Sequence, residues 1–359
     1  MDQSIIISKN IKAELANAIS ECEHDKLFVL TDVTTREKCW PILQDHQSLK
    51  DAQPITIEAT DTHKNLASLS QVWQSLQAGG ATRHSCLVNI GGGMVTDLGG
   101  FAASTFKRGI NFINIPTTLL AMVDASVGGK TGINFGGLKN EIGVFNDARF
   151  VIIDTNFLQS LDALNLRSGY AEMLKHGLIS NEEHWGELLR FDLSTPNLDR
   201  LKNMVAESVQ VKEHIVKGDP TEQGLRKALN LGHTFGHAFE SFSLKGALPS
   251  SNSGNSTPAL LHGYAVAFGL ICELYLSAVK LGFPADKMQQ TVRFICDYYG
   301  TYNITCNDYP ELISLMMHDK KNTAGIINFT LLGDIGDIRI NQTATEEEMK
   351  EALDFFREA

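Results

Sequence analysis

The first 160 or so residues alternate short apolar runs with amphipathic stretches, and this alternation restricts the fold more than any other feature of the chain. Each run is long enough for one strand and apolar on both faces, as in a buried parallel strand. The stretches between the runs have helical periodicity, which is typical of an α/β layer domain. The apolar runs are Ile5–Ile7, Leu27–Leu30, Ile55–Ile57, Cys86–Ile90, Phe112–Ile115 and Phe150–Ile153.

The second half of the chain has helical periodicity almost throughout. A length of 359 residues is large for one hydrophobic core, so we predict two domains. The boundaries are placed at 1–163 for the α/β domain and 164–359 for a mostly α-helical domain. Ile326–Leu332 is the only strand expected late in the chain, and the polar segment Pro249–Pro258 is expected to be an exposed loop.

The composition excludes several classes of protein. With 43% hydrophobic and 20% charged residues the chain is that of a soluble globular protein. A formal net charge of −11 argues against nucleic acid as a partner, because phosphate backbones are bound by basic surfaces. The six cysteines are scattered without metal or disulfide spacing, and we find no signal peptide and no membrane span. We therefore expect a reduced, cytoplasmic protein that has no membrane partner.

Three glycines follow one of the predicted strands directly. Gly91–Gly93 come after Cys86–Ile90 and lead into Met94–Thr105, which is expected to be helical and carries Asp97 in its first turn. Glycines at a strand-to-helix turn let backbone N–H groups approach a phosphate at the start of the helix. The spacing differs from the usual dinucleotide motif, so a simple tight turn deserves equal weight. If the turn binds phosphate, the first domain is a Rossmann-like α/β domain that binds a nucleotide.

A second glycine-rich segment, Pro116–Asn140, also suits an anionic ligand. It carries Lys130 and Lys139 among its glycines, and lysine with nearby backbone donors binds phosphate well. The residues around Lys130 read GGKT, like the end of a P-loop. The P-loop is excluded because Asp124 occupies the position of its first glycine.

Four polar residues in Gly224–His237 follow one another at spacings of four, three and four. At about 100° per residue of α-helix, their side chains fall within a sector of roughly 60°. We therefore expect one buried helix with a polar face, which needs a metal ion, phosphate or carboxylate as partner. Histidines satisfied by backbone carbonyls are the alternative. The residues are Arg226, Asn230, His233 and His237.

The same half of the chain carries the residue types of a catalytic metal site. Two histidines and one carboxylate, with one position left open, form a typical zinc set. Glu172 is the candidate carboxylate, although Lys175 could simply be its ion-pair partner on the same helix. Spacing does not choose two histidines among His176, His233, His237 and His262.

Taken together, these segments closely resemble the 3-dehydroquinate synthase family of the sugar-phosphate cyclase superfamily. The resemblance spans roughly residues 60 to 325 and is carried by GGGMVTDLGGF, RGINFINIPTTLLAMVDASVGGKTGIN, LKNEIGVF, GYAEMLKHG, LRKALNLGHTFGHAFE, LHGYAVAFG and MMHDKK. It implies conversion of 3-deoxy-D-arabino-heptulosonate 7-phosphate to 3-dehydroquinate and phosphate in the shikimate pathway. The steps implied are transient oxidation by NAD, elimination of phosphate, return of the hydride and an aldol closure. NAD is thus regenerated, and the net reaction is that of a lyase.

The resemblance also implies a role for individual residues. The metal ligands are Glu172, His233 and His262. The catalytic residues are Asp124, Lys130, Lys175 and His237. The substrate-binding residues are Arg108, Asn140, Lys212, Arg226, Asn230 and Lys320, with Lys212 and Arg226 assigned to the substrate carboxylate. The NAD-binding residues are Asp32, Asp61, Lys64, Gly92, Gly93, Val95, Asp97, Thr117, Thr118, Lys130 and Lys139.

The implied cofactors are NAD and one divalent metal ion, zinc or possibly cobalt. The implied partners are a sugar phosphate and a second copy of the chain, with Arg108 reaching the neighbouring active site of a homodimer. The chain departs from the family's motifs at Asn165, at Asp219-Pro220 and at Tyr264, which replaces the glutamate of HGE. Alternatives are a sibling cyclase with another sugar phosphate, a metal-dependent polyol dehydrogenase, or a ligand-binding homologue without activity.

Overall fold

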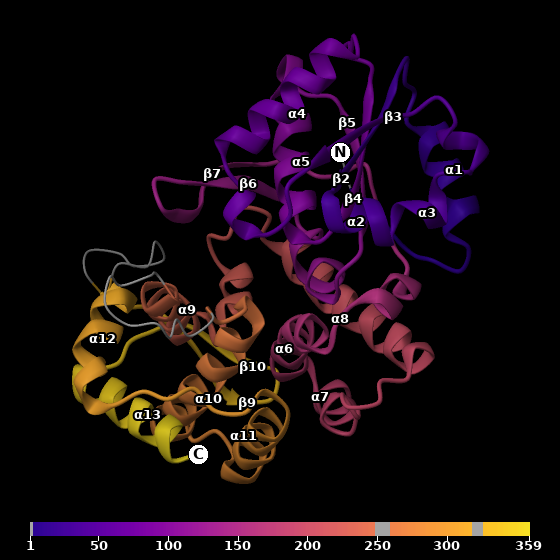
Figure 1. The fold of residues 1–359 in the computed structure, drawn as a ribbon. Coiled ribbons are helices and arrows are strands. Elements are labelled where there is room, and N and C mark those ends of the chain that lie inside the picture. Colours follow the sequence, from indigo (N-terminus) through magenta and orange to yellow (C-terminus); the bar gives the residue numbers. More distant parts are fainter. Residues whose placement is uncertain (1–2, 248–258, 318–325) are drawn as a thin grey trace. The chain divides into compact units, whose positions relative to one another are not determined.

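The computed structural model describes residues 3–247, 259–317 and 326–359, and it contains two compact units (Figure 1). The first unit consists of Met1–Asp162 and Leu198–Val209, and the second of Ala163–Asn197 and Gln210–Ala359. Helix α8 (Leu198–Gly218) therefore contributes residues to both units. The predicted loop Pro249–Pro258 lies outside the described residues.

The first unit is built on a six-stranded parallel sheet, as the apolar runs predict. The strand order is β1-β8-β5-β4-β2-β3, and all five neighbouring pairs are parallel. The inner strands β2, β4 and β8 are buried along their whole length, which explains why they are apolar on both faces. The strands are β1 (Ser4–Ile7), β2 (Leu27–Asp32), β3 (Gln53–Ile57), β4 (Cys86–Gly91), β5 (Asn111–Pro116) and β8 (Phe150–Ile153).

Helices connect these strands, and asparagine side chains define where two of the longer ones begin. Asn10 and Asn65 accept backbone N–H groups at the starts of α1 and α4, so each helix begins directly after its cap. Helix α5 packs against β4, β5 and β6 (Lys130–Phe135). The helices of this unit are α1 (Ile11–Glu21), α2 (Val33–Lys38), α3 (Trp40–Leu43), α4 (Leu66–Ala78) and α5 (Gly93–Thr105).

The strand order places a switch point between β2 and β4. The chain moves from β2 outward to β3, and it then returns to the other side of β2 to form β4 and β5. In open parallel sheets, ligands bind beside the carboxyl ends of the strands at such a point. The carboxyl ends of β2, β4 and β5 are Asp32, Gly91 and Pro116.

The glycine-rich segment after β5 ends in a two-stranded antiparallel hairpin rather than a loop. Strand β6 (Lys130–Phe135) pairs with β7 (Leu138–Phe145). Gly136 and Gly137, with φ of 60° and 82°, join the strands. A two-residue turn with two positive φ angles matches the twist of a hairpin, and glycine adopts it without strain.

The second unit is mostly helical, as predicted. Helix α10 lies at its centre and packs against α6, α9, α11, α13 and β9. By length and composition α10 could cross a membrane, but 67% of its most apolar stretch is buried, so it is the core helix of a soluble protein. The helices are α6 (Ala163–Ser180), α7 (Glu182–Leu189), α9 (His233–Ala247), α10 (His262–Leu281), α11 (Ala285–Tyr299), α12 (Tyr309–Met317) and α13 (Glu346–Glu358).

The late part of the chain holds two strands where one is predicted. The predicted run Ile326–Leu332 becomes β9 (Phe329–Asp334), and β10 (Asp337–Gln342) pairs with it as an antiparallel hairpin. The prediction misses β10 because its sequence, DIRINQ, is polar and only partly buried. Its pairing with β9, rather than its own apolarity, makes it a strand.

The prediction of one continuous helix over the polar residues of Gly224–His237 is wrong. Leu225–Asn230 form a 3₁₀ helix, and α9 begins only at His233. Gly232 separates the two with a φ of 79°, a left-handed conformation that ends helical geometry. Arg226 and Asn230 therefore do not share one helical face with His233 and His237.

Candidate active site

The glycine turn after β4 leads into the start of α5 at the switch point of the sheet, where a helix start can accept an anion. Gly92 precedes α5 and has no side chain to cap it. A Cβ atom on Gly92 would lie 3.0 Å from Cγ2 of Thr118, so the turn and the segment after β5 approach closely. Thr117 donates its N–H to the carbonyl of Gly91 at 3.0 Å. The start of α5 thus presents backbone donors without a covering side chain.

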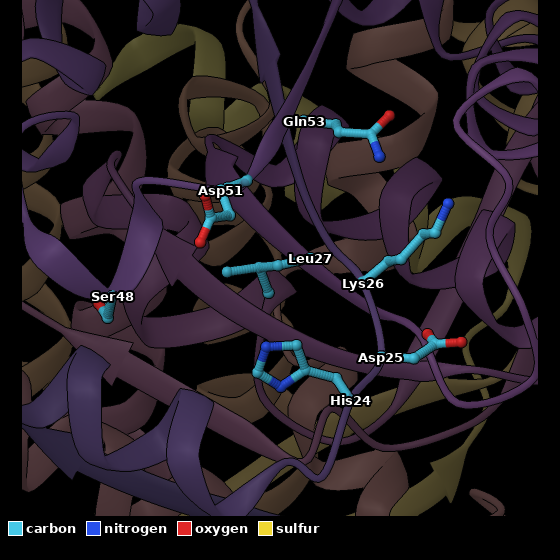
Figure 2. Close-up of a pocket in the computed structure, with 8 residues that line it drawn as sticks. His24, Asp25, Lys26, Leu27, Ser48, Asp51 and Gln53 are labelled. Carbon is cyan, nitrogen blue, oxygen red and sulfur yellow. The ribbon is translucent and has the colours of Figure 1, made fainter.

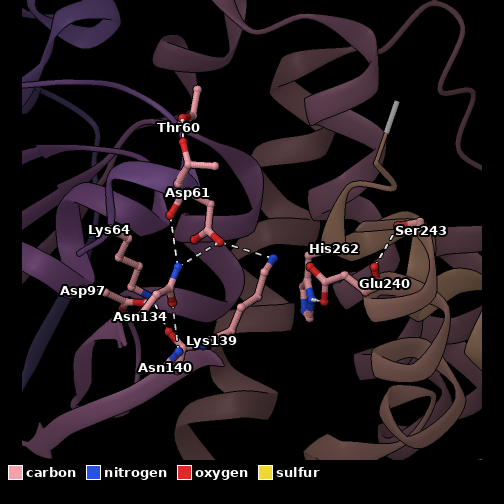
Figure 3. A network of polar contacts seen from close by, with 11 residues as sticks. Thr60, Asp61, Lys64, Asp97, Asn134, Lys139, Asn140, Glu240, Ser243 and His262 are labelled. Atoms are coloured by element: carbon pink, nitrogen blue, oxygen red, sulfur yellow. Dashed lines mark hydrogen bonds and ion pairs between the residues drawn. The ribbon is translucent and has the colours of Figure 1, made fainter. Parts of the chain in front are cut away.

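A polar network lies in the same unit and includes several predicted NAD and substrate residues. The Lys64 ammonium is 4% exposed and contacts both Asp97 and Asn140 (Figure 3). Lys139 lies 3.3 Å from a carboxylate oxygen of Asp61. Asn134 joins the two pairs, since it accepts the N–H of Asn140 at 2.9 Å and donates to Asp61 at 3.0 and 3.2 Å.

The other predicted residues of this unit have more varied surroundings. Asp32 is buried and caps α2 through the N–H of Thr35, at 2.8 Å. Asp124 lies in a short π-helix (Ala121–Ala125), and Lys130 is exposed at the start of β6. Arg108 is exposed, with a φ of 69°. That left-handed backbone is unfavourable for arginine and is the kind of strain that often accompanies function.

A polar cavity of about 270 Å³ lies at the opposite, amino-terminal edge of the same sheet (Figure 2). It is lined in part by Asp25, Lys26 and Gln53, at the starts of β2 and β3. Lys26 and Gln53 donate to the carbonyl of Gly79 at 2.8 and 3.2 Å. These contacts hold the loops around the sheet, so we assign the cavity no catalytic part.

Three side chains that could hold a metal ion converge in the helical unit. Glu172 comes from α6, His233 from the start of α9 and His262 from the start of α10. Oε1 of Glu172 lies 3.5 Å from Nε2 of His233 and 3.4 Å from Nε2 of His262. Ligand atoms about 2.0–2.2 Å from a tetrahedral zinc ion lie roughly 3.3–3.6 Å from one another. The donor set fits such an ion.

Buried charges control the protonation of these donors. Burial by itself raises the pKa of the Glu172 carboxyl, but the ammonium of Lys175 and the hydrogen bond from His262 hold that pKa well below its usual range. Lys175 contacts the other oxygen, Oε2, and is itself 1% exposed. The predicted ion pair is therefore present, and it keeps Glu172 ionised as a metal ligand must be.

A second carboxylate orients His262. Glu240, buried in α9, accepts the Nδ1 proton of His262 at 3.2 Å (Figure 3). Burial lowers the pKa of the His262 imidazole, but the carboxylates of Glu240 and Glu172 raise it above its usual range. A carboxylate on one ring nitrogen directs the other towards a metal, so Glu240 supplies an outer carboxylate although position 264 is tyrosine. Ser243 donates to the carbonyl of Glu240 at 2.8 Å.

Arg226 is held by a tight turn before the 3₁₀ helix. It is 2% exposed, and its Nη1 donates to the carbonyl of Pro220 at 2.6 Å. Asp219 accepts the backbone N–H groups of Gln223, Gly224 and Arg226 at 3.0, 2.6 and 3.0 Å. The hydrogen bonds from Gln223 and Gly224 lower the pKa of the Asp219 carboxyl. These hydrogen bonds fix the backbone and one guanidinium nitrogen of Arg226 in place.

The remaining predicted residues of this unit lie on several elements. Lys212 is buried in α8, and Asn230 donates to a carboxylate oxygen of Glu222 at 2.9 Å. The His237 ring lies 5.3 Å from that of His233 and 6.1 Å from that of His262. His176 is fully buried in α6. Lys320, a predicted phosphate ligand, lies outside the described residues.

Two residues that are not predicted from the sequence, Glu240 and Asn134, form hydrogen bonds to predicted site residues. Glu240 follows His233 by seven positions and His237 by three, so helical periodicity could have placed it beside them. Asn134 carries no such signal, because its contacts with Asp61 and Asn140 depend on the hairpin.

Comparison with known proteins identifies the family. Residues 54–168 match the family described as 3-dehydroquinate synthase N-terminal, and residues 169–322 match 3-dehydroquinate synthase C-terminal. A 3-dehydroquinate synthase from Parabacteroides distasonis is 52% identical over 358 residues, covering 100% of this chain and 99% of the relative. The chain belongs to the 3-dehydroquinate synthase family. Its activity is that of a phosphate-eliminating lyase of the shikimate pathway, as the resemblance implies.

Relatives of the synthase share its fold across a range of reactions. A 3-dehydroquinate synthase from Crocosphaera subtropica is 38% identical and covers 83% of this chain and 80% of the relative. The structure of 2-epi-5-epi-valiolone synthase from Streptomyces hygroscopicus, with NAD⁺ and Zn²⁺ bound, is 26% identical in sequence. The match covers 100% of this chain and 97% of the valiolone synthase, with a TM-score of 0.84. A probable glycerol dehydrogenase from Sinorhizobium meliloti is 13% identical in sequence. The match covers 99% of this chain and 96% of the dehydrogenase, with a TM-score of 0.64. The fold therefore leaves the reaction open, and the sequence matches decide it for the synthase.

Proposed function

We propose that the synthase converts 3-deoxy-D-arabino-heptulosonate 7-phosphate into 3-dehydroquinate and phosphate, using NAD in the first unit and a divalent metal ion in the second. The observation that carries the proposal is the convergence of Oε1 of Glu172 with the Nε2 atoms of His233 and His262. Three ligands leave a coordination position open for substrate oxygens, as in catalytic rather than structural zinc sites.

The metal and NAD divide the chemistry. When bound, NAD takes up and returns a hydride, and the metal ion polarises the neighbouring hydroxyl oxygens of the substrate. Glu172, His233 and His262 would hold the ion, with Lys175 keeping Glu172 ionised and Glu240 orienting His262. Bound NAD⁺ and Zn²⁺ in the related valiolone synthase, and bound NAD⁺ and Co²⁺ in a 2-deoxy-scyllo-inosose synthase, support both cofactors.

NAD would bind at the carboxyl edge of the sheet. The start of α5 at Gly92 and Gly93 offers backbone donors for its diphosphate. Asp97, Lys64 and Asp61 form the adjacent polar network and would contact the rest of the cofactor. The switch point between β2 and β4 supports this placement independently of any motif.

Two buried cations would recognise the substrate carboxylate. Lys212 is 6% exposed and Arg226 is 2% exposed. Buried cations form strong, charge-assisted hydrogen bonds to a carboxylate, whereas a sugar phosphate without a carboxylate offers them none of these. Lys212 and Arg226 therefore favour the heptulosonate over the substrates of the sibling cyclases. Asn140, Asn230, His237 and Lys320 would contact the phosphate.

We further propose that the synthase works as a cytoplasmic homodimer. The β6–β7 hairpin exposes a group of apolar side chains that a monomer would leave in water. Helix α5 packs against β6, but β7 is exposed along its whole length, so a second copy would bury it. Arg108, in its left-handed conformation, would then reach the neighbouring active site. The apolar residues are Phe135, Leu138, Ile142, Val144 and Phe145, which are 38–60% exposed.

A phosphate-release assay tests the function. The purified synthase should release phosphate from the heptulosonate phosphate with no net change in nicotinamide absorbance. A chelator should stop the release, and added zinc or cobalt should restore it. Glucose 6-phosphate and sedoheptulose 7-phosphate serve as the comparison substrates. Turnover of either in place of the heptulosonate phosphate would assign the chain to a sibling reaction, and accumulation of NADH would indicate a dehydrogenase.

A further inference from the structure

A third buried carboxylate, Glu273, meets the start of the helix that carries His233. Glu273 belongs to α10 and is 0% exposed. One of its oxygens accepts the N–H of Gly232 at 2.6 Å, and the other accepts those of Thr234 and Phe235 at 2.9 and 3.4 Å. Neither the motifs nor the metal-ligand set assigns this residue a role.

The start of α9 depends on this carboxylate because it has no cap of its own. The first N–H groups of a helix lack partners within the helix and are usually satisfied by a side chain directly before it. That position is Gly232, which has no side chain and a φ of 79°. Glu273 takes the place of the cap from another helix, and its charge suits the positive end of α9.

The hydrogen bonds of Glu273 flank the metal ligand on both sides. His233 is the first residue of α9, between Gly232 and Thr234, whose N–H groups both donate to Glu273. The Nδ1 of His233 lies 3.1 Å from the carbonyl of Leu231, which directs its Nε2 towards Glu172. A shift of this backbone would break charge-assisted hydrogen bonds and move the ligand atom.

Close packing between α9 and α10 keeps Glu273 in register with this helix start (Figure 1). A Cβ atom on Gly269 would lie 1.9 Å from the carbonyl oxygen of Gly232. Glu273 follows Gly269 by four residues and so lies one turn further along the same face of α10. The two backbones therefore touch where the carboxylate binds, which leaves little space for it to move.

We propose that Glu273 is a positioning residue that sets the metal affinity of the synthase by holding the backbone of His233. It contributes no ligand atom. The inference rests on the proposed metal site, because it assigns Glu273 an effect on that site alone. Outer residues that orient metal ligands typically change metal affinity by about 10–100-fold.

The test compares zinc binding by metal-free wild type and Glu273→Gln, measured by competition with a chromogenic chelator. Glutamine keeps one oxygen acceptor but places an NH₂ group against an N–H donor. We expect zinc to bind about 10–100-fold more weakly, with KM for the substrate unchanged at saturating zinc. Wild type that binds no zinc would contradict the proposed function itself. Wild type that binds zinc, with Glu273→Gln equal to it within twofold, would overturn the inference.

A control separates positioning from general stability. Thr291 is fully buried and accepts the indole N–H of Trp185 at 3.0 Å, in contacts that include no metal ligand. Thr291→Val should lower the thermal midpoint and leave zinc affinity unchanged. If Glu273→Gln does not fold, Glu273→Asp replaces it, because aspartate keeps the charge on a shorter side chain. Zinc affinity of Glu273→Asp within twofold of wild type would again overturn the inference. Failure of both to fold would overturn the inference, because Glu273 would then support the whole unit.

Discussion

At the scale of single residues, three buried carboxylates of the helical unit have three different partners. Glu172 contacts Lys175 and faces two histidines, Glu240 accepts a proton from His262, and Glu273 accepts backbone N–H groups. A buried carboxylate without partners would be strongly destabilising or would bind a proton. Each carboxylate thus has a partner that stabilises its negative charge, and only Glu172 belongs to the candidate metal-binding set.

Loss of the His233 imidazole should remove the metal. His233→Ala deletes one of three ligands, so we expect zinc binding and phosphate release to disappear together, as measured by metal analysis after gel filtration and by the release assay. His214, exposed on α8, provides the matched control, and His214→Ala should retain both properties. Stoichiometric zinc in an active His233→Ala enzyme would exclude His233 as a ligand.

Arg226 should act on substrate binding rather than on the metal. Arg226→Ala removes a buried cation from the proposed carboxylate, so KM should rise by the equivalent of about 2–5 kcal/mol. Lys227, the next residue, donates to Asn341 at 3.0 Å, and Lys227→Ala should leave KM unchanged. Steady-state kinetics distinguish the two variants, and an unchanged KM in Arg226→Ala would place the substrate carboxylate elsewhere.

At the scale of elements, the packing of α6, α9 and α10 creates the metal-binding set. Each helix contributes one donor, and α10 packs against both of the others. The predicted polar helix face fails here because Gly232 interrupts the helix. The interruption makes His233 the first residue of α9 rather than an interior one. Local periodicity therefore identified the residues, but it could not identify the break.

The contact between α9 and α10 should tolerate no added side chain. Gly269→Ala would place a Cβ atom 1.9 Å from the carbonyl oxygen of Gly232, so overpacking should cost about 1–3 kcal/mol or unfold the unit. Gly218→Ala is the control, because its Cβ would lie 3.6 Å from Leu225 and should change stability by less than about 1 kcal/mol. Urea unfolding of both proteins measures the difference, and equal stabilities would show that the contact can relax.

At the scale of the whole molecule, each unit has its own chemistry. The unit with the parallel sheet contains the uncapped helix start proposed for the NAD phosphates, whereas the helical unit contains the candidate metal donors and the buried cations. The apolar runs predict the sheet correctly because buried parallel strands are apolar on both faces. The apolar runs could not predict β10, which is only partly buried, or the exposure of the apolar residues on β7. Neither strand belongs to the buried parallel sheet.

The proposed homodimer can be tested at the hairpin. Ile142 is 39% exposed on β7, and Ile142→Glu would place a charge in the proposed apolar interface. We expect this variant to elute as a monomer in gel filtration with light scattering and to lose activity through the displaced Arg108. Val279, 53% exposed on α10, gives the control Val279→Glu, which should remain a dimer. A dimeric Ile142→Glu protein would move the interface away from the hairpin.

The sequence by itself determined the fold class, the family and the residue types of the site, because these follow from local apolarity and from motifs of adjacent residues. Only the tertiary structure placed the Nε2 atoms of His233 and His262 within 3.5 Å of Oε1 of Glu172, since spacing along the chain leaves His176, His233, His237 and His262 as candidates. It also placed Glu240 against His262 and Glu273 against the backbone N–H groups at the start of α9. The physical reason is that convergence of donor atoms within a few ångströms depends on how separate helices pack, which no single stretch of sequence encodes.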